Sequence, residues 1–382
     1  MKTRLALITE IIAPYRIPVL NALATREDTD LHVIFLAESD ASLRQWLIYK
    51  DEIRFSYEVL PSWRRRLGAQ NLLFNWGVAR ALVAAQPQVI ICGGYNYPAS
   101  WRAAYWAKHR RIPFLLWIES TALDRRPGLP LIERMKRHFF NLCRGFIVPG
   151  KASREYVRAF GVSDDRIFAA PNAIDVNLFQ NLAAQARQDS VQLREALQLP
   201  ARYFLNVGRL VPEKGVFDLV DAYAKLEMSV RSQVSLLFLG DGVAREELAA
   251  RARLVSPGSI EFRGFVHRDD LPAYYALAEA FVFPTQSDPW GFVVNEAMAC
   301  GAPVIASEVA GCVPDLVQNL QTGLVVPSRD LASLAKSLAF LAERPQLRTQ
   351  MAGLATEIIA QYSPEAWAAG IASAAAATGG GQ

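Results

Sequence analysis

The sequence predicts an α/β protein of two domains, each with a parallel sheet covered by helices. At 382 residues, the chain has the length of two globular domains. Short apolar runs alternate with segments of helical period, and this series occurs twice along the chain. Runs such as Leu5–Ile8 are apolar on both faces, as in strands buried between layers of helices. We therefore expect two Rossmann-like domains.

In the first half, apolar runs predict strands and periodic segments predict helices. We expect strands at Thr3–Thr9, Leu31–Ala37, Gln88–Cys92, Pro113–Ile118 and Gly145–Pro149. We expect helices at Pro18–Thr25, Asn71–Ala85, Ala99–Arg110, Leu131–Cys143 and Ala152–Phe160. The apolar N-terminus is interrupted by Glu10 and no cleavage site of small residues follows, so we interpret it as a strand and not as a signal peptide.

The second half repeats the scheme. We expect strands at Tyr203–Val207, Val234–Leu239, Ser259–Phe262, Ala280–Phe283, Pro303–Ala306 and Gly323–Val326. We expect helices at Val216–Leu226, Ala244–Leu254, Leu271–Ala278, Val294–Cys300 and Asp330–Leu341. The polar stretch Phe179–Leu199 predicts a boundary between a domain of residues 1–185 and a domain of residues 186–362. A last helix, residues 363–377, begins with Ser363 as N-cap and Pro364 at the first helical position.

Composition excludes several classes of protein. The four cysteines have no spacing typical of zinc or iron–sulfur sites, and so few thiols indicate a reducing, cytoplasmic location. No apolar run approaches the ~20 residues of a spanning helix. The arginines are scattered and form no nucleic-acid recognition module.

Charge is distributed unevenly along the chain. Through Ser190 there are 26 Lys and Arg against 17 Asp and Glu, and from Val191 onward 15 against 20. The basic half contains Trp63–Leu67 followed by apolar Leu72–Phe74, and further cations at Arg125-Arg126 and Arg134–His138. These segments are either solvated loops or a face for anionic lipid headgroups or an acceptor phosphate, with peripheral contact at the inner face of the membrane.

Ligands bind at the carboxyl ends of strands in open parallel sheets, so the loops after strands carry the chemistry. After Tyr203–Val207 come Gly208-Arg209 and then Lys214-Gly215. The glycine permits close approach to the backbone, and the two cations could hold a diphosphate. The alternative is an ordinary loop with two solvated cations.

After Ala280–Phe283, a second loop carries Asp288, Gly291, Phe292, Val293 and Glu296. The amides of Phe292 and Val293 could face an anion, Glu296 could accept hydrogen bonds from a ribose diol, and Asp288 could hold sugar hydroxyls. Alternatively, Asp288 is a turn residue and Glu296 a carboxylate near a helix N-terminus. No GxGxxG motif follows the first strand and no GxxxxGK[ST] motif occurs.

Taken in order, these motifs resemble the GT-B glycosyltransferases of family 4, the retaining group 1 enzymes. The resemblance covers most of Tyr203–Leu341 and rests on the cation pair, on the acidic-x7-acidic element from Asp288 to Glu296, and on the following Glu-Ala-Met-Ala-Cys-Gly run. It implies two Rossmann-like domains facing across a cleft, with the C-terminal helix returning to the N-terminal, acceptor-binding domain. The second domain would bind the nucleotide-sugar donor.

The resemblance also implies roles for individual residues. Arg209 and Lys214 would hold the donor diphosphate, Glu296 the ribose, and Asp288 the transferred sugar, while Phe265 and Val266 would lie near the base. The family's usual Glu is replaced by Asp288, its Gly-Gly pair after the first strand by Ala13–Arg16, and its His after Pro113–Ile118 by Glu119-Ser120. We name Arg16 and Glu119 as candidates for the acceptor side; Glu119 could equally be a surface residue.

The implied reaction is a retaining, metal-independent transfer of a hexosyl group from a nucleotide diphosphate sugar to a hydroxyl acceptor, possibly lipid-linked, in polysaccharide, lipopolysaccharide or glycolipid assembly. Positive groups would stabilise the leaving diphosphate, so we expect no cofactor and no metal ligand. The alternatives are a GT-B sugar-nucleotide epimerase or phosphorylase, and a non-catalytic nucleotide-sugar-binding protein.

Overall fold

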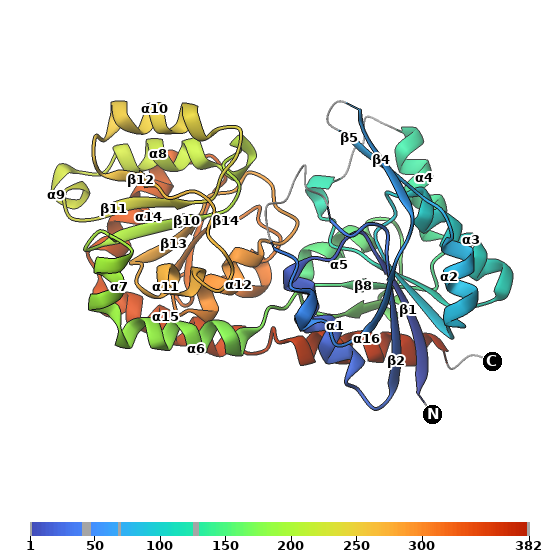
Figure 1. Ribbon diagram of the computed structural model, residues 1–382. Helices are drawn as coiled ribbons and strands as arrows, with labels where there is room; N and C mark the ends of the chain where they lie inside the picture. The colour runs from blue at the N-terminus through green and yellow to red at the C-terminus, as the bar shows by residue number, and fades with distance from the viewer. Residues whose placement is uncertain (1, 40–46, 68–69, 125–129, 380–382) are drawn as a thin grey trace. The chain divides into compact units, whose positions relative to one another are not determined.

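A computed structural model describes residues 2–39, 47–67, 70–124 and 130–379 of the chain. It divides into two compact units, the first formed by Met1–Ile174 with Ser363–Gln382 and the second by Asp175–Tyr362 (Figure 1). Each unit is an α/β structure with a parallel sheet, which confirms the fold class expected from the apolar runs. Among the described helices, none has both the length and the apolar character of a membrane span.

The boundary between the units differs from the expected one. It lies at Ile174 and Asp175, so helix α6 (Val176–Gln188), which residues 1–185 were expected to include in large part, belongs wholly to the second unit. The side chain of Asp175 caps this helix by accepting a hydrogen bond from the Leu178 amide. The helix packs against α11 (Leu271–Ala276) and α12 (Phe292–Ala299), and this packing decides its membership.

The first unit has a seven-stranded parallel sheet in the order β3-β2-β1-β6-β7-β8-β9. Its strands are β1 (Thr3–Thr9), β2 (Thr29–Phe35), β3 (Ser56–Val59), β6 (Val89–Gly93), β7 (Phe114–Trp117), β8 (Gly145–Val148) and β9 (Ile167–Ala169). Its helices are α1 (Ile17–Ala24), α2 (Val78–Ala85), α3 (Pro98–Arg110), α4 (Pro130–Phe140), α5 (Lys151–Arg158) and α16 (Pro364–Gly379).

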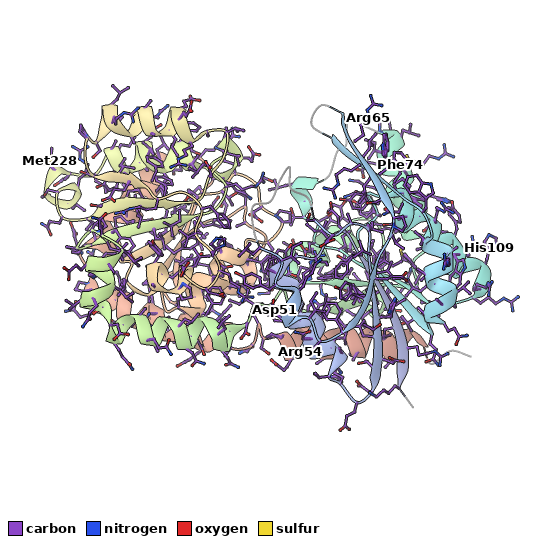
Figure 2. All side chains as sticks on the ribbon, viewed as in Figure 1. Asp51, Arg54, Arg65, Phe74, His109 and Met228 are labelled. Carbon is purple, nitrogen blue, oxygen red and sulfur yellow. The ribbon has the colours of Figure 1, made fainter. Side chains whose placement is uncertain are left out.

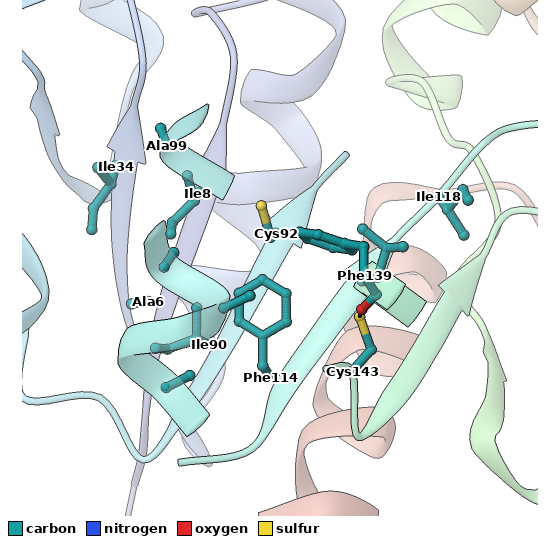
Figure 3. Packing of buried hydrophobic residues seen from close by; sticks show 14 of the residues in the cluster. Ala6, Ile8, Ile34, Ile90, Cys92, Ala99, Phe114, Ile118, Phe139 and Cys143 are labelled. Carbon is teal, nitrogen blue, oxygen red and sulfur yellow. Dashed lines mark hydrogen bonds between the residues drawn. The ribbon is translucent and has the colours of Figure 1, made fainter. Parts of the chain in front are cut away.

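Both faces of this sheet are buried. Along β1, Ala6 and Ile8 pack into one hydrophobic cluster, whereas Leu5 and Leu7 pack into another on the opposite face. Figure 3 shows part of the first cluster, where residues of the central strands meet Phe139 of α4. Alternate residues of a strand point to opposite faces, so a fully apolar run is what a sheet covered on both sides requires.

Helix α16 returns to the first unit, as expected. It packs against α1, against β8 and against the edge strand β9. The Ser363 hydroxyl accepts a hydrogen bond from the Ala366 amide, which confirms the predicted N-cap. The helix continues to Gly379, slightly beyond the expected end at residue 377.

The helix predicted over Asn71–Ala85 is wrong in its first part. Residues Gln70–Asn75 form strand β5, which pairs antiparallel with β4 (Ser62–Leu67) in a separate two-stranded sheet. Gly77, with a φ of 88°, then starts helix α2. The apolar residues of this segment also fit a helical period, and only their pairing with β4 makes them a strand.

The second unit has a six-stranded parallel sheet in the order β12-β11-β10-β13-β14-β15. Its strands are β10 (Tyr203–Val207), β11 (Ser235–Leu239), β12 (Ile260–Phe262), β13 (Ala280–Phe283), β14 (Val304–Ser307) and β15 (Gly323–Val326). Besides α6, α11 and α12, its helices are α7 (Ser190–Ala196), α8 (Val216–Ala224), α9 (Met228–Arg231), α10 (Arg245–Val255), α13 (Val313–Leu316), α14 (Leu331–Ala342) and α15 (Pro345–Ile359). The chain order reverses between β10 and β13, which is where a ligand is expected.

Candidate functional site

The loop after β10 is held by close backbone contacts to the loops after β11 and β13. The Leu210 amide donates a hydrogen bond to the carbonyl of Asp241, and the Gly208 amide donates to the carbonyl of Leu239. A Cβ atom on Gly240 would lie only 1.9 Å from the carbonyl oxygen of Gly208, so the two backbones approach more closely than a side chain would allow. The predicted glycine at the end of β10 is therefore part of a rigid junction between neighbouring loops.

Gly215 joins the same loop to the end of β13. Its φ of +69° is in the left-handed region, and a Cβ there would lie 1.9 Å from the Pro284 carbonyl oxygen. Only a glycine satisfies both conditions without displacement of the backbone. This contact places Lys214, the preceding residue, beside the loop that follows β13.

We expect Gly215→Ala to lower the free energy of unfolding by about 3 kcal/mol or more, since backbone strain and overlap with Pro284 add. Gly353→Ala is the matched control. Gly353 lies within α15, and a Cβ there would meet nothing within 4 Å. The control should raise stability by about 0.5–1 kcal/mol. Chemical denaturation measures both; equal effects of the two substitutions would contradict the role of Gly215.

Lys214 and Asp288 form an ion pair between the two loops. The Lys214 ammonium donates a hydrogen bond of 2.6 Å to Asp288 Oδ2, and both side chains are largely buried. Asp288 Oδ1 accepts a hydrogen bond from the Trp290 amide, so the carboxylate is fixed on both oxygens. A cation and an acid predicted from separate motifs are thus brought together at the ends of β10 and β13.

Arg209 lies at the same strand end but has a different environment. It is exposed, and among the described residues it forms no ion pair. Because no described carboxylate neutralises its charge, the Arg209 guanidinium is available to bind an anionic ligand.

Helix α12 begins directly after the Asp288 loop. Its N-cap is Gly291, with a φ of 100°, whose backbone packs against the ring of Phe283 at the end of β13. Phe292 and Val293 form the first helical positions and are half-buried. The helix therefore starts at the carboxyl edge of the sheet, where an N-terminus favours anions. That its amides bind one remains a prediction.

Glu296 is held by a partner that sequence reasoning did not identify. The Tyr275 hydroxyl, from α11, donates a hydrogen bond of 2.9 Å to Glu296 Oε2. Burial raises the pKa of the Glu296 carboxyl to about 7, although this hydrogen bond acts in the opposite direction. With a pKa near 7, the Glu296 carboxyl changes between its protonated and ionised forms around neutral pH, and the hydrogen bond from Tyr275 of α11 orients it.

Phe265 and Val266 follow β12, and Gly264 ties their loop to the β11 loop because its carbonyl accepts a hydrogen bond of 2.6 Å from the Gly240 amide. Phe265 is 42% exposed and contacts His267 edge to face, while Val266 is half-buried. An exposed ring on a fixed loop is available to stack on a planar ligand.

In the first unit, the structure brings the two acceptor-side candidates together. The Arg16 guanidinium lies 3.6 Å from a carboxylate oxygen of Glu119 and donates a hydrogen bond to the Thr9 hydroxyl. It also lies 4.5 Å from the ring centre of Trp117. Thr9 and Trp117 end β1 and β7, so Arg16 is fixed at the carboxyl edge of this sheet. Neither Thr9 nor Trp117 belongs to a motif from which its contact with Arg16 could have been predicted.

Most of the predicted charged residues thus lie in pairwise contacts within one unit. Lys214 contacts Asp288 directly, Arg16 contacts Glu119, and Glu296 contacts Tyr275. Within the described ranges, no group of three or more His, Cys, Asp or Glu could hold a metal ion. Arg125 and Arg126 lie outside the described residues, as do the side chains of Arg66 and Leu67.

Two family profiles match the chain, one within the second unit and one almost wholly within the first. The family described as "Glycosyl transferases group 1" matches residues 192–358, and "Glycosyltransferase Family 4" matches residues 20–178. These ranges contain the Lys214–Asp288 pair and Glu119, respectively.

Individual relatives agree. The chain is 32% identical over 191 residues to an alpha-D-kanosaminyltransferase of Streptomyces kanamyceticus, with 48% of each chain covered. It is 29% identical over 183 residues to the O-antigen chain mannosyltransferase B of Escherichia coli, with 47% of this chain and 46% of the relative covered. The chain thus spans about half the length of these curated relatives.

A solved structure extends the similarity to nearly the whole chain. The Alr3699/HepE protein of Anabaena, crystallised with UDP and glucose, superposes with a TM-score of 0.75 at 20% identity, covering 97% of this chain and 98% of the other. At that identity the similarity establishes the fold, two Rossmann-like domains, and does not extend to the ligand.

Proposed function

Because the chain belongs to the group 1 glycosyltransferases of family 4, which have the GT-B fold, we propose that it moves a sugar from a nucleotide diphosphate sugar to a hydroxyl acceptor. The observation that carries the proposal is the Lys214–Asp288 ion pair, at the strand ends where the chain order of the second sheet reverses. Beside it lies Arg209, which forms no ion pair with any residue that the structure describes. This edge combines fixed positive charge with a carboxylate that can accept sugar hydroxyl groups.

The cations have the chemistry that the leaving group requires. As the bond between the sugar C1 and the phosphate oxygen breaks, negative charge develops on the departing diphosphate. Lys214 and Arg209 are positioned to stabilise this charge, which is the role a divalent metal has in other transferases. We propose that the reaction proceeds without a metal.

We assign the carboxylates to the donor's hydroxyl groups. Glu296, when ionised, can accept hydrogen bonds from both hydroxyls of a ribose. Asp288 is one methylene shorter than the glutamate usual in the family, but its ion pair with Lys214 holds it beside the cation that we assign to the diphosphate. We propose that Asp288 contacts the transferred hexose.

We propose retention of anomeric configuration, with the acceptor oxygen attacking C1 from the face that the diphosphate leaves. The new bond joins C1 to the acceptor oxygen, the electron pair of the broken bond stays on the diphosphate, and a phosphate oxygen takes the acceptor's proton. No side chain is then needed as a general base. Arg16 and Glu119 are our candidates for orienting the acceptor.

The acceptor is proposed to be a saccharide of a cell-surface polymer or glycolipid, built in the cytoplasm. The support is that one relative is named an O-antigen chain mannosyltransferase, and that four free cysteines are buried without disulfides. Free thiols are typical of a reducing compartment.

A screen of nucleotide sugars tests the proposed function. Thermal unfolding of the chain is measured with UDP-, GDP-, ADP- and dTDP-sugars in turn. In a separate assay, the release of nucleoside diphosphate from each donor is measured during prolonged incubation with the folded protein. We expect one donor at saturating excess to raise the melting temperature, because a ligand that binds only the folded state stabilises it. The same donor should be hydrolysed slowly, since water replaces the missing acceptor.

Other products would contradict the transferase. An epimerase would convert the sugar without releasing nucleoside diphosphate. A phosphorylase would require inorganic phosphate and a preformed glycoside. A non-catalytic binding protein would show the thermal shift and no turnover with any acceptor. Arg209→Ala should reduce the shift at a given donor concentration, because it removes one charged contact to the diphosphate and Arg209 forms no ion pair with any described residue whose loss would itself change stability.

A further inference from the structure

The β4–β5 hairpin is attached to the first unit through one of its two faces. Leu73 is only 2% exposed, and the buried Asn75 donates a hydrogen bond from its side-chain amide to the carbonyl of Leu36. β5 also packs against helix α3. These contacts fix the orientation of the hairpin, whose place in the first unit is shown in Figure 1. Its opposite face therefore has a fixed orientation relative to that unit.

The opposite face, which we call the outer face, comprises Trp63, Arg65, Leu72 and Phe74. Trp63 pairs with Phe74 across the two strands, their ring centres are 6.0 Å apart, and the residues are 47% and 40% exposed. Arg65 is exposed and pairs with Leu72. Figure 2 labels Arg65 and Phe74 on this hairpin.

The sequence around the outer face is free of acidic residues. Between Glu58 and Glu119 there is no Asp or Glu, but there are eight Lys and Arg and five of the chain's eight tryptophans. Two of these eight cations, Arg102 and Lys108, are exposed on helix α3, against which β5 packs. An aromatic pair in such a setting has the composition of surfaces that bind the boundary between water and anionic lipid.

We propose that the outer face of the β4–β5 hairpin docks the first unit onto an anionic lipid bilayer. In this docked state the contacting rings of Trp63 and Phe74 lie at the level of the headgroups, and Arg65 contacts lipid phosphate. A tryptophan is stable there because its ring is apolar and its N–H is polar. The aromatic and electrostatic contributions act together, as stable interfacial binding requires.

A bilayer fits this face better than a nucleic acid does. Single-stranded nucleic acids bind to separate aromatic platforms, one base on each ring. Here the two rings are tilted by 38° and contact each other, so they form one continuous apolar patch. A patch of this kind can insert a short distance into a bilayer, at the boundary between the headgroups and the acyl chains.

Vesicle sedimentation tests the proposal with the full chain. We use vesicles of phosphatidylcholine alone and vesicles that also contain phosphatidylglycerol. The unaltered chain should sediment with the anionic vesicles, and binding should weaken as salt rises. Arg65→Glu should weaken binding by about tenfold or more, because it reverses one charge near the surface. Trp63→Ser with Phe74→Ser should weaken it at least as much.

Matched controls lie on the second unit. Arg253→Glu makes the same change of net charge at an exposed site in α10, and Leu254→Ser removes a side chain that is 84% exposed. Both should bind vesicles as the unaltered chain does. Thermal unfolding and release of nucleoside diphosphate from the donor should be unchanged in all variants, which separates loss of docking from loss of the donor site.

Three results would overturn the proposal. The unaltered chain could fail to bind anionic vesicles, or the hairpin variants could bind as well as the controls. Alternatively, light scattering could show that the chain self-associates and that the hairpin variants do not, in which case the outer face binds a second copy of the chain.

Discussion

Lys214→Ala should reduce kcat/KM for the sugar donor by about 100-fold, because in the proposed reaction the lost ammonium stabilises charge that develops only as the diphosphate leaves. The same substitution should also lower stability, by about 1–3 kcal/mol, because it leaves the largely buried Asp288 carboxylate without its cation. Steady-state kinetics and chemical denaturation measure the two effects separately.

Three further variants isolate the cause. Arg209→Ala should slow transfer by about tenfold or more without a loss of stability, since Arg209 is exposed and forms no ion pair with any described residue. Lys225→Ala, at the exposed end of α8, should change neither quantity. In a double-mutant cycle with Asp288→Asn, the stability losses should be strongly non-additive. Unchanged kinetics in both Lys214→Ala and Arg209→Ala would remove the proposed diphosphate site.

The strands of both sheets were predictable because burial on two faces leaves a strong sequence signal. Tyr203–Val207 and Ala280–Phe283 have the predicted bounds, and such uninterrupted apolar runs rarely occur in surface segments. Short edge strands gave no such signal. β3 and β9 were missed, and in β3 every residue is exposed or half-buried, so the apolar pattern is lost.

The hairpin and the boundary were mispredicted for a related reason. Leu72, Leu73 and Phe74 can form part of a helical stripe or a strand, and the antiparallel pairing with β4 decides between them. Helix α6 is amphipathic and polar enough to resemble a linker, and its contacts with α11 and α12 place it in the second unit. Both outcomes depend on tertiary contacts that a local pattern does not contain.

Residues of the candidate site could be identified where they follow strands in sequence. Lys214 and Asp288 were identified in separate loops because neighbouring strands end at one edge, and the structure shows that they touch. The hydrogen bond from Tyr275 to Glu296 was not predictable, since Tyr275 lies in an earlier helix and carries no motif. Its signal was only a tyrosine on the buried side of a short helix.

The raised pKa of Glu296 gives a prediction about stability. A glutamate titrates near 4.5 in the unfolded chain and at about 7 here, so between these values the folded state holds a proton that the unfolded state has released. The free energy of unfolding should therefore fall as pH rises from about 4.5 to about 7, by up to about 3 kcal/mol from this residue. Glu296→Gln should remove this component and make the unliganded protein more stable than the unaltered chain at pH 8.

Nucleotide binding should show the opposite dependence on pH. The ionised Glu296 accepts hydrogen bonds on both oxygens, whereas the protonated form has lost an acceptor, so affinity should fall by about tenfold as pH is lowered from about 8 to 6. Calorimetry with UDP as the first probe measures the affinity. In Glu296→Gln the affinity should be low at every pH, and the exposed Glu308→Gln is the matched control.

Tyr275→Phe distinguishes a positioning role for the tyrosine from simple packing. The phenylalanine keeps the ring that packs edge to face against Phe281, 5.5 Å between centres, but donates no hydrogen bond to Glu296. Since that hydrogen bond lowers the pKa of Glu296, its loss should move the midpoint of the binding profile to higher pH. A carboxyl that merely fills space would show no such displacement. A stable Tyr275→Phe variant with an unchanged profile would mean that Glu296 does not bind the ribose as an ionised group, because the charge that Tyr275 stabilises would then have no effect on the ligand.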